Sequence, residues 1–193
     1  MNQFIVVGYY TIDTLYEKEA EVLRRSLVRH DVPHRIVGVP NQGSWALNTS
    51  YKPQFIEEMM EQYPELCIVY VDVDAEFLAY PTFFGIFSGD IGVYEFPWTE
   101  YRLDDTRKEL LSGTLFFRNT EKVVEQVRRW GARCHQKPKT WDQIHLAEVL
   151  ENNYDLLPPE YCKIFDKMDW CKDPVIVHYQ ASRRVRNRRG RLD

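Results

Sequence analysis

Short apolar runs alternate along the chain with segments in which apolar residues recur every three or four positions. A short run predicts a buried strand, and the spacing of three and four predicts a helix with one apolar face. The expected strands are residues 4–7, 35–39 and 66–71, and the expected helices are 16–29 and 51–62. This alternation is typical of a doubly wound sheet, so we predict an α/β fold with a single, mostly parallel Rossmann-like sheet flanked by helices.

The second half of the chain continues the pattern less regularly. Two further strands are expected at 91–95 and 113–117, separated by the polar segment 98–109, a candidate mobile loop over a site. Later elements are a helix with Val123, Val127, Trp130 and Cys134 on one face, a shorter helix from about Asp142, and a last strand at 175–177 that delivers His178. Near the start, a polar turn is expected from Tyr9 to Asp13, and 43–50 is expected to be a loop.

Length and composition suit one domain without a disulfide framework. With 193 residues the chain can bury most of its apolar surface, and we assign residues 1–182 to the domain and 183–193 to a basic tail. The four cysteines show no paired C-x-x-C spacing, and Cys67 lies within an apolar run, which favours a reducing compartment. Neither a secretory leader nor a membrane-spanning segment is expected, so we predict a cytoplasmic protein.

The net charge of −4 is unevenly distributed. Residues 181–193 carry six arginines against one aspartate, a net +5, which leaves −9 on the preceding residues. An acidic body argues against a protein whose main surface follows nucleic acid, because such binding needs a broad cationic face. Contact with a polyanion is expected only through the Arg-rich tail, whose simpler interpretation is a solvated terminus.

The most informative residues are Asp72 and Asp74, which follow the buried run 66–71. In an extended chain, positions i and i+2 face the same way, so both carboxylates could meet one cation while Val71 and Val73 stay in the core. Two like charges this close need a cation or a proton to neutralise them. Ligands of open α/β sheets bind at the carboxyl ends of the strands, where this pair falls. The alternative is a strand end that runs out into solvent.

Three other features occur in a fixed order after this pair. They are Ser112-Gly113-Thr114 before an apolar strand, Trp141-Asp142-Gln143 at a helix start, and His178 at the last strand's end. With Asp72 and Asp74, this order resembles the GT-A nucleotide-diphospho-sugar transferases, in particular the glycogenin-like glycosyltransferases. The resemblance covers nearly the whole chain, and it implies that Asp72, Asp74 and His178 hold Mn²⁺ or Mg²⁺. Oxygen ligands with one imidazole suit Mn²⁺. Taken alone, His178 could be a core or surface histidine.

The resemblance also implies where the donor binds. Tyr10, Thr11 and Tyr16 match the contacts to the nucleotide base, and Lys52 matches a lysine that reaches phosphate. Asp142 is implied to lie beside the donor sugar and Gln143 beside its anomeric centre. Glycine at 113 permits close backbone approach, and the hydroxyls of Ser112 and Thr114 can bond sugar hydroxyls. Simpler interpretations are turn chemistry at 10–16, a solvated Lys52, a strand-initiating turn at 112–114 and a helix-dipole contact for Asp142.

The chain departs from the glycogenin pattern after His178. Gln180-Ala181-Ser182-Arg183-Arg184 replaces the family's Gly and Lys-Pro-Trp, so Arg183 and Arg184 are the candidate phosphate ligands there. The expected activity is metal-dependent transfer of a sugar from a nucleotide diphosphate donor, most simply UDP-linked, to an unidentified hydroxyl acceptor, with retention slightly favoured by the order of motifs. The alternatives are a nucleotidyltransferase acting on a sugar phosphate and a non-catalytic nucleotide-sugar-binding module.

Overall fold

The computed structural model describes residues 1–100 and 106–181. Its main sheet has six strands in the order β2-β1-β3-β6-β5-β7. They are β1 (Phe4–Thr11), β2 (His34–Val39), β3 (Cys67–Val71), β5 (Ile91–Pro97), β6 (Lys108–Phe117) and β7 (Asp155–Leu156). Strand β1 pairs in parallel with both β2 and β3, whereas β6 runs antiparallel to β3 and β5. The predicted strand–helix alternation of the first half is confirmed.

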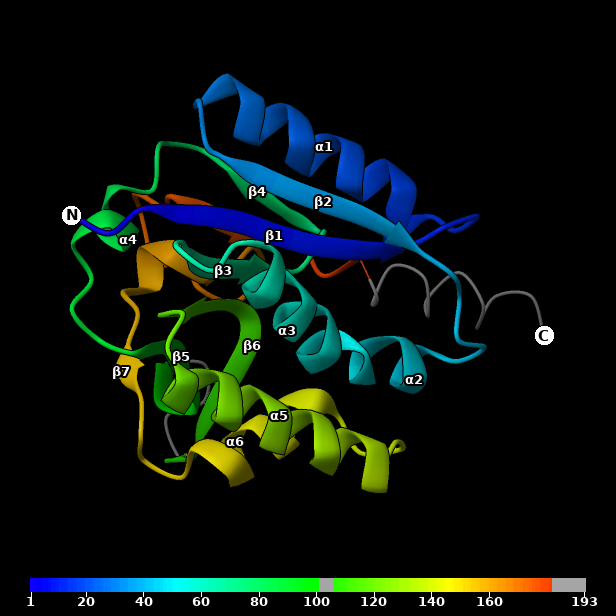
Figure 1. The fold of residues 1–193 in the computed structure, drawn as a ribbon. Helices are drawn as coiled ribbons and strands as arrows, with labels where there is room; N and C mark the ends of the chain where they lie inside the picture. Colours follow the sequence, from blue (N-terminus) through cyan, green and yellow to red (C-terminus); the bar gives the residue numbers. More distant parts are fainter. Residues whose placement is uncertain (101–105, 182–193) are drawn as a thin grey trace.

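Helices cover both faces of this sheet. One face carries α1 (Tyr16–Arg29), and the other carries α3 (Lys52–Gln62), α5 (Glu121–Gln136) and α6 (Asp142–Leu150) (Figure 1). The buried residues of β1 alternate between the two layers, because successive side chains of a strand point to opposite faces. Val6 packs with the apolar face of α1, and Val7 packs with the cluster that contains Phe55 and Trp130.

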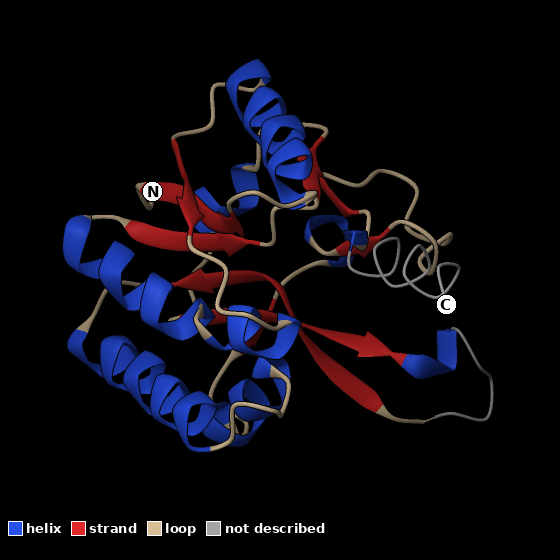
Figure 2. Cartoon of the chain, turned by 90° about the vertical axis from the view of Figure 1, so that its right-hand side faces the viewer, coloured by secondary structure: helices blue, strands red, loops and turns tan. Residues whose placement is uncertain are grey.

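A second, three-stranded sheet was not predicted. It has the order β4-β9-β8 and consists of β4 (Ala75–Phe77), β9 (Ile176–His178) and β8 (Lys163–Ile164). The predicted last strand therefore exists as β9 but belongs to this small sheet. Short elements complete the described chain: α2 (Trp45–Ser50), α4 (Thr82–Ile86) and the 3-10 turns at Trp98–Glu100 and Pro159–Tyr161. Figure 2 shows β5 and β6 running out from the body as a long hairpin.

Two local predictions were wrong. The expected loop at 43–50 contains α2, which begins after Ser44, whose hydroxyl accepts a hydrogen bond from the Leu47 N–H. The expected turn from Tyr9 is strand as far as Thr11, because β1 stays in register with β2 up to the pair of Thr11 and Val39.

The expected loop at 98–109 is shorter than predicted, since Lys108 and Glu109 already belong to β6. Residues 101–105 of this segment lie outside the described residues. The basic tail at 183–193, with Arg183 and Arg184, also lies outside them.

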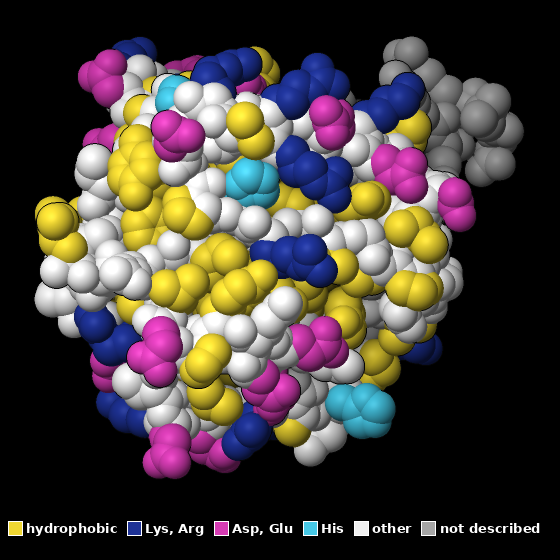
Figure 3. Space-filling view, turned by 45° about the horizontal axis from the view of Figure 1, so that its top comes forward, with side chains coloured by type: hydrophobic (Ala, Val, Ile, Leu, Met, Phe, Trp, Pro, Cys, Tyr) yellow, Lys and Arg dark blue, Asp and Glu magenta, His cyan; other side chains and the backbone are white. Residues whose placement is uncertain are grey.

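The four cysteines are buried free thiols, as expected from their spacing. In the described ranges, none of the helices combines the length and the apolar character that crossing a bilayer requires. On the face that carries α1, acidic and basic side chains are interspersed with apolar ones (Figure 3).

Candidate metal and nucleotide-sugar site

Asp72 and Asp74 lie in a turn that joins the two sheets. Strand β3 ends at Val71, the Asp72 N–H donates to the Gly113 carbonyl at 2.8 Å, and the Ala75 N–H donates to the Asp72 carbonyl at 3.0 Å. The chain is therefore turned rather than extended here, and the expectation that the i, i+2 alternation aligns the carboxylates was wrong. The side chains have different partners but line the same two pockets. Val71 and Val73 are buried, as predicted.

The Asp72 carboxylate is fixed through one of its oxygens. Its Oδ1 accepts a hydrogen bond from the Tyr70 hydroxyl at 2.9 Å and lies 3.1 Å from the Lys52 ammonium. Burial, assisted by the Asp72 charge, raises the pKa of Tyr70 well above its usual value, so the phenol remains a donor. Both contacts orient Asp72, and they leave Oδ2 toward the space beside Gly113.

Lys52 is buried beneath this carboxylate. Its Nζ lies 3.0 Å from Asp142 Oδ2 and donates to the Ser112 carbonyl and hydroxyl at 3.1 and 3.0 Å. Burial alone would lower the pKa of Lys52, but the charges of Asp142 and Asp72 outweigh it and hold the pKa above the usual 10.5. Lys52 is thus a permanently charged group that ties β3, β6 and α6 together, and it is not a solvated surface lysine.

Asp142 lies behind the pocket wall. Its carboxylate is nearly fully buried, accepts from the Ser112 hydroxyl at 2.8 Å, and is absent from the residues that line the two pockets described below. The Trp130 indole N–H donates to the Asp142 carbonyl at 2.9 Å, which fixes the start of α6 against α5. In this geometry Asp142 positions Lys52 and Ser112, whereas its neighbour Gln143 faces the pocket.

Asp74 and His178 form a second pair at the edge of the small sheet. The Asp74 carboxylate accepts from the Ala181 N–H at 2.8 Å, and its Oδ1 lies 3.7 Å from His178 Nδ1. Burial would raise the pKa of Asp74, but the neighbouring His178 and the hydrogen bond from the Ala181 N–H lower it, so the carboxylate stays ionised. Gln180 adopts a positive φ of 51°, and this turn brings the Ala181 N–H to Asp74.

The imidazole of His178 is held from its far side. Its Nε2 lies 2.7 Å from the Thr114 hydroxyl, so an Nε2–H donated there would leave the Nδ1 lone pair to a cation. Gly113 keeps the adjoining space open, because a Cβ there would lie 3.3 Å from His178 Cε1, 3.4 Å from Nδ1 and 3.6 Å from Asp72 Oδ2. The glycine predicted for close approach therefore borders this space.

The chemistry of these side chains, though not their present spacing, would suit a divalent cation of the Mn²⁺ type. Asp72 Oδ2 and His178 Nδ1 lie within 3.6 Å of one point beside Gly113, and Asp74 Oδ1 lies 3.7 Å from that nitrogen. Two carboxylates with one imidazole are ligands that Mn²⁺ accepts. In the chain outside 101–105 and 182–193, no three His, Cys, Asp or Glu side chains already stand close enough to hold an ion. Asp72 and Asp74 would therefore have to close around one.

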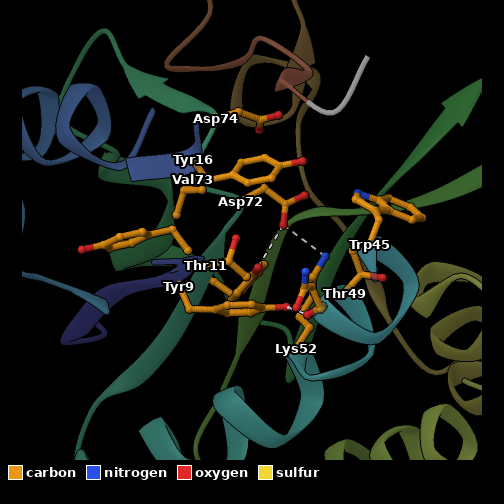
Figure 4. A pocket seen from close by; sticks show the side chains of 12 residues that line it. Tyr9, Thr11, Tyr16, Trp45, Thr49, Lys52, Asp72, Val73 and Asp74 are labelled. Carbon is orange, nitrogen blue, oxygen red and sulfur yellow. Dashed lines mark hydrogen bonds and ion pairs between the residues drawn. The ribbon is translucent and has the colours of Figure 1, made fainter. Parts of the chain in front are cut away.

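A pocket of about 630 Å³, open to solvent, lies on one side of this pair. Residues of β1, α1, α2 and α3 form its walls, among them Tyr10, Thr11 and Tyr16, which the sequence predicts as base contacts. Figure 4 shows Lys52 reaching Asp72 from below and Trp45 of α2 to one side. The Tyr9 hydroxyl donates to the Asn48 carbonyl at 2.6 Å and so fastens α2 to the sheet.

A larger pocket of about 1220 Å³, which we call the second pocket, lies on the other side and shares Asp72, Asp74 and Trp45 with the first. Its wall includes Ser112, Gly113, Thr114, Gln143 and His178, which the sequence singled out. The Gln143 amide donates to the Glu109 carboxylate, which also accepts from the Trp98 indole at 2.9 Å.

The structure brings most of the predicted site residues to the two pockets. Asp142 lies behind the wall, and Arg183 and Arg184 lie outside the described residues. The wall residues that were missed include Trp45 and Tyr70. Trp45 fell in an unrecognised helix, whereas Glu109 belongs to the segment 98–109 that was predicted as a loop over a site. The available signal for Tyr70 was its position in the sequence, two residues before Asp72.

Comparison with solved structures identifies the fold. A glycosyltransferase involved in the glycosylation of the major capsid of PBCV-1 superposes over the whole of both chains, with a TM-score of 0.70 and 15% identity. The bifunctional glycosyltransferase WbbM matches 93% of this chain and 46% of its own, with a TM-score of 0.65 and 14% identity. GlyE from Streptococcus pneumoniae TIGR4 matches 93% of this chain and 55% of its own, at a TM-score of 0.58 and 16% identity.

The chain thus spans about half the length of WbbM and of GlyE. No protein-family model and no curated protein sequence matches it. At such low identity the likeness concerns the fold, which is that of the GT-A-like glycosyltransferases.

Proposed function

We propose that the protein is a metal-dependent glycosyltransferase that moves a sugar from a nucleotide diphosphate sugar, most simply a UDP-sugar, to a hydroxyl of an acceptor. One observation carries the proposal. Asp72 and Asp74 line both pockets, and His178 lines the second pocket beside Asp74, within a fold shared with glycosyltransferases.

The two pockets suit the two ends of such a donor. The nucleoside would lie in the first pocket among Tyr10, Thr11 and Tyr16, where an aromatic ring can stack on the base. The diphosphate would reach the shared boundary at Asp72 and Asp74, and the sugar would enter the second pocket beside Gly113 and Gln143. Glycosyl donors of this kind are anionic, so carboxylates at the boundary need a cation between them and the phosphates.

The transfer breaks the bond between the anomeric carbon and the diphosphate oxygen, which leaves with the electron pair. A bound Mn²⁺ or Mg²⁺ would stabilise the charge that builds on this leaving group. The acceptor oxygen then bonds to the anomeric carbon, and its hydroxyl proton passes to the departing diphosphate. Gln143 and Glu109 lie on the wall where these groups would meet, and Lys52, itself held by Ser112, contacts Asp72. The order of motifs favours retention of configuration.

A nucleotidyltransferase would need a glycine-rich loop after its first strand to cradle phosphates. Here Gly8 to Thr11 belong to β1, and a Cβ at Gly8 would lie 2.7 Å from the Val71 carbonyl. The glycine therefore serves close packing of two neighbouring strands. This observation supports sugar transfer over nucleotidyl transfer.

The proposal is tested by calorimetric titration of UDP with and without Mn²⁺. Wild-type protein should bind UDP tightly only with the metal, and the double variant Asp72→Asn, Asp74→Asn should lose this dependence while its circular dichroism is unchanged. Asp90→Asn is the matched control, since that exposed carboxylate pairs with Arg118 and Lys122 and lines neither pocket. Undiminished UDP affinity in the double variant would reject the metal role.

A thermal-shift screen of nucleotide sugars then identifies the donor, because a ligand of the native state raises its melting temperature. Release of nucleotide diphosphate from the stabilising donor separates an enzyme from a binding module. Formation of nucleoside triphosphate from a sugar nucleotide and pyrophosphate would instead establish the nucleotidyltransferase.

A further inference from the structure

We propose that Trp45 and Trp141 form the acceptor subsite and that the acceptor is a neutral saccharide. The inference rests on the proposed transferase function and adds the chemical class of the second substrate. Both indoles line the second pocket, although Trp45 begins α2, Trp141 directly precedes α6, and the two lie almost 100 residues apart in sequence. Their ring centroids are 5.9 Å apart and their planes meet at 81°.

Both side chains expose part of their apolar surface beside a pocket. The exposed fraction is 40% for Trp45 and 46% for Trp141, whereas Trp130 is fully buried in the core. Exposed apolar surface that borders a pocket marks a place where a ligand binds. Because the rings are nearly perpendicular, they form a corner that can contact a flat ligand on its face and along one edge.

A pyranose ring matches this corner chemically. Its two faces present C–H groups that pack on an indole, and its rim presents hydroxyls that need hydrogen-bond partners. The same pocket supplies an amide from Gln143 and a carboxylate from Glu109. These two groups bond to each other, and both keep further hydrogen-bonding capacity that saccharide hydroxyls can use and an aliphatic acceptor cannot.

The position of the corner is suited to transfer. Trp141 directly precedes Asp142 and Gln143, and Trp45 borders both pockets, next to the shared boundary at Asp72 and Asp74. An acceptor that stacks there lies beside the place where the sugar would leave its diphosphate.

The charges on the wall favour a neutral acceptor. With a cation bound at Asp72 and Asp74, the remaining charges among the described side chains of the second pocket are Glu109 and Lys167, which balance each other; the Lys167 ammonium lies over the Trp98 ring at 4.6 Å. A wall without excess positive charge does not attract an anionic glycan or an acidic peptide.

The test uses saturation-transfer NMR with a panel of neutral disaccharides, consisting of maltose, cellobiose, lactose and mannobiose, in the presence of UDP and Mn²⁺. At least one disaccharide should bind to wild-type protein at millimolar concentration. Trp141→Ala should weaken that affinity by about tenfold or more. UDP affinity should be unchanged in this variant, since Trp141 does not line the first pocket. The control is Trp170→Ala, an equally exposed tryptophan that lines neither pocket.

Three results would overturn the inference. They are the absence of binding by every disaccharide while UDP still binds, equal saccharide affinity in Trp141→Ala and wild type, and preferential binding of the peptide Gly-Tyr-Gly. Each leaves the transferase proposal standing, because UDP titration is measured on the same samples. Failure of wild-type protein to bind UDP would instead remove the proposed function itself.

Discussion

The Lys52 ammonium lies 3.0 Å from the Asp142 carboxylate, and both side chains are almost completely buried. The same ammonium lies 3.1 Å from Asp72, whose side chain is 40% exposed. One cation therefore links a hidden carboxylate to one that faces a pocket. Removing either partner of a buried ion pair is costly because the remaining charge loses its compensation.

Replacing Lys52 by methionine should therefore lower the free energy of unfolding by about 3 kcal/mol. Urea denaturation measures the change. Adding Asp142→Asn to Lys52→Met should restore part of the lost stability, because no uncompensated charge then remains at position 142. A loss below about 1 kcal/mol in the single variant would contradict the buried ion pair.

Thr114→Val should weaken Mn²⁺-dependent UDP binding by about tenfold to a hundredfold, because the His178 ring loses the partner that orients it. Calorimetric titration with and without the metal measures the effect. Thr114→Ser keeps the hydroxyl and should bind nearly as wild type does. Equal affinities in the valine and serine variants would show that Thr114 does not position the imidazole.

Gly113→Ala should also impair metal-dependent UDP binding, because the new Cβ would lie 3.3 Å from the His178 ring and displace it. The matched control is Gly131→Ala in α5, where the Cβ would meet only Pro53 at 3.8 Å. That control should bind UDP normally and gain about 0.5–1 kcal/mol of stability, since alanine favours a helix interior. Unchanged metal dependence in Gly113→Ala would place the cation elsewhere.

Tyr154→Phe should lower stability by about 1 kcal/mol at neutral pH, and the loss should shrink as the pH falls through the folded pKa of Glu95. The hydrogen bond from the Tyr154 hydroxyl, with a smaller contribution from Lys108, lowers the pKa of Glu95. A lowered pKa stabilises the fold above the unfolded value of about 4.3, and this contribution is lost as the pH falls through the folded value. Urea denaturation across this range measures it.

Lys108→Ala is the comparison for Tyr154→Phe. Lys108 is 68% exposed, so its ion pair with Glu95 should contribute less than the tyrosine does. A pH-independent loss in Tyr154→Phe would mean that packing, and not the hydrogen bond to the carboxylate, stabilises this contact.

Much of the first half of the fold could be predicted because its signals are local. The spacing of Ala20, Leu23 and Leu27 predicted α1 with its observed bounds. The direction of β6 could not be read in this way, since strand direction is decided by pairing with β3 and β5. Helix α2 was missed because it is six residues long and has no buried position, so it shows no apolar periodicity.

The candidate site was predictable by residue type but not by geometry. Asp72 and Asp74 were selected by an argument about an extended chain, yet a turn presents them. The burial of Lys52 depends on Ser112 and Asp142, which are distant in sequence, so no local pattern could have shown it. Thr114 was singled out as a contact to sugar, and its hydroxyl instead lies against His178.

The turn from Asp72 to Ala75 connects the large sheet to the small one, and the proposed ligands come from both. Asp72 directly follows β3, whereas His178 is the last residue of β9. The affinity of the proposed site for a cation should therefore depend on how tightly the two sheets pack against each other. A substitution that weakens the packing between the two sheets should abolish cation binding before it unfolds either sheet. Conversely, a bound cation should stabilise the packing of one sheet against the other.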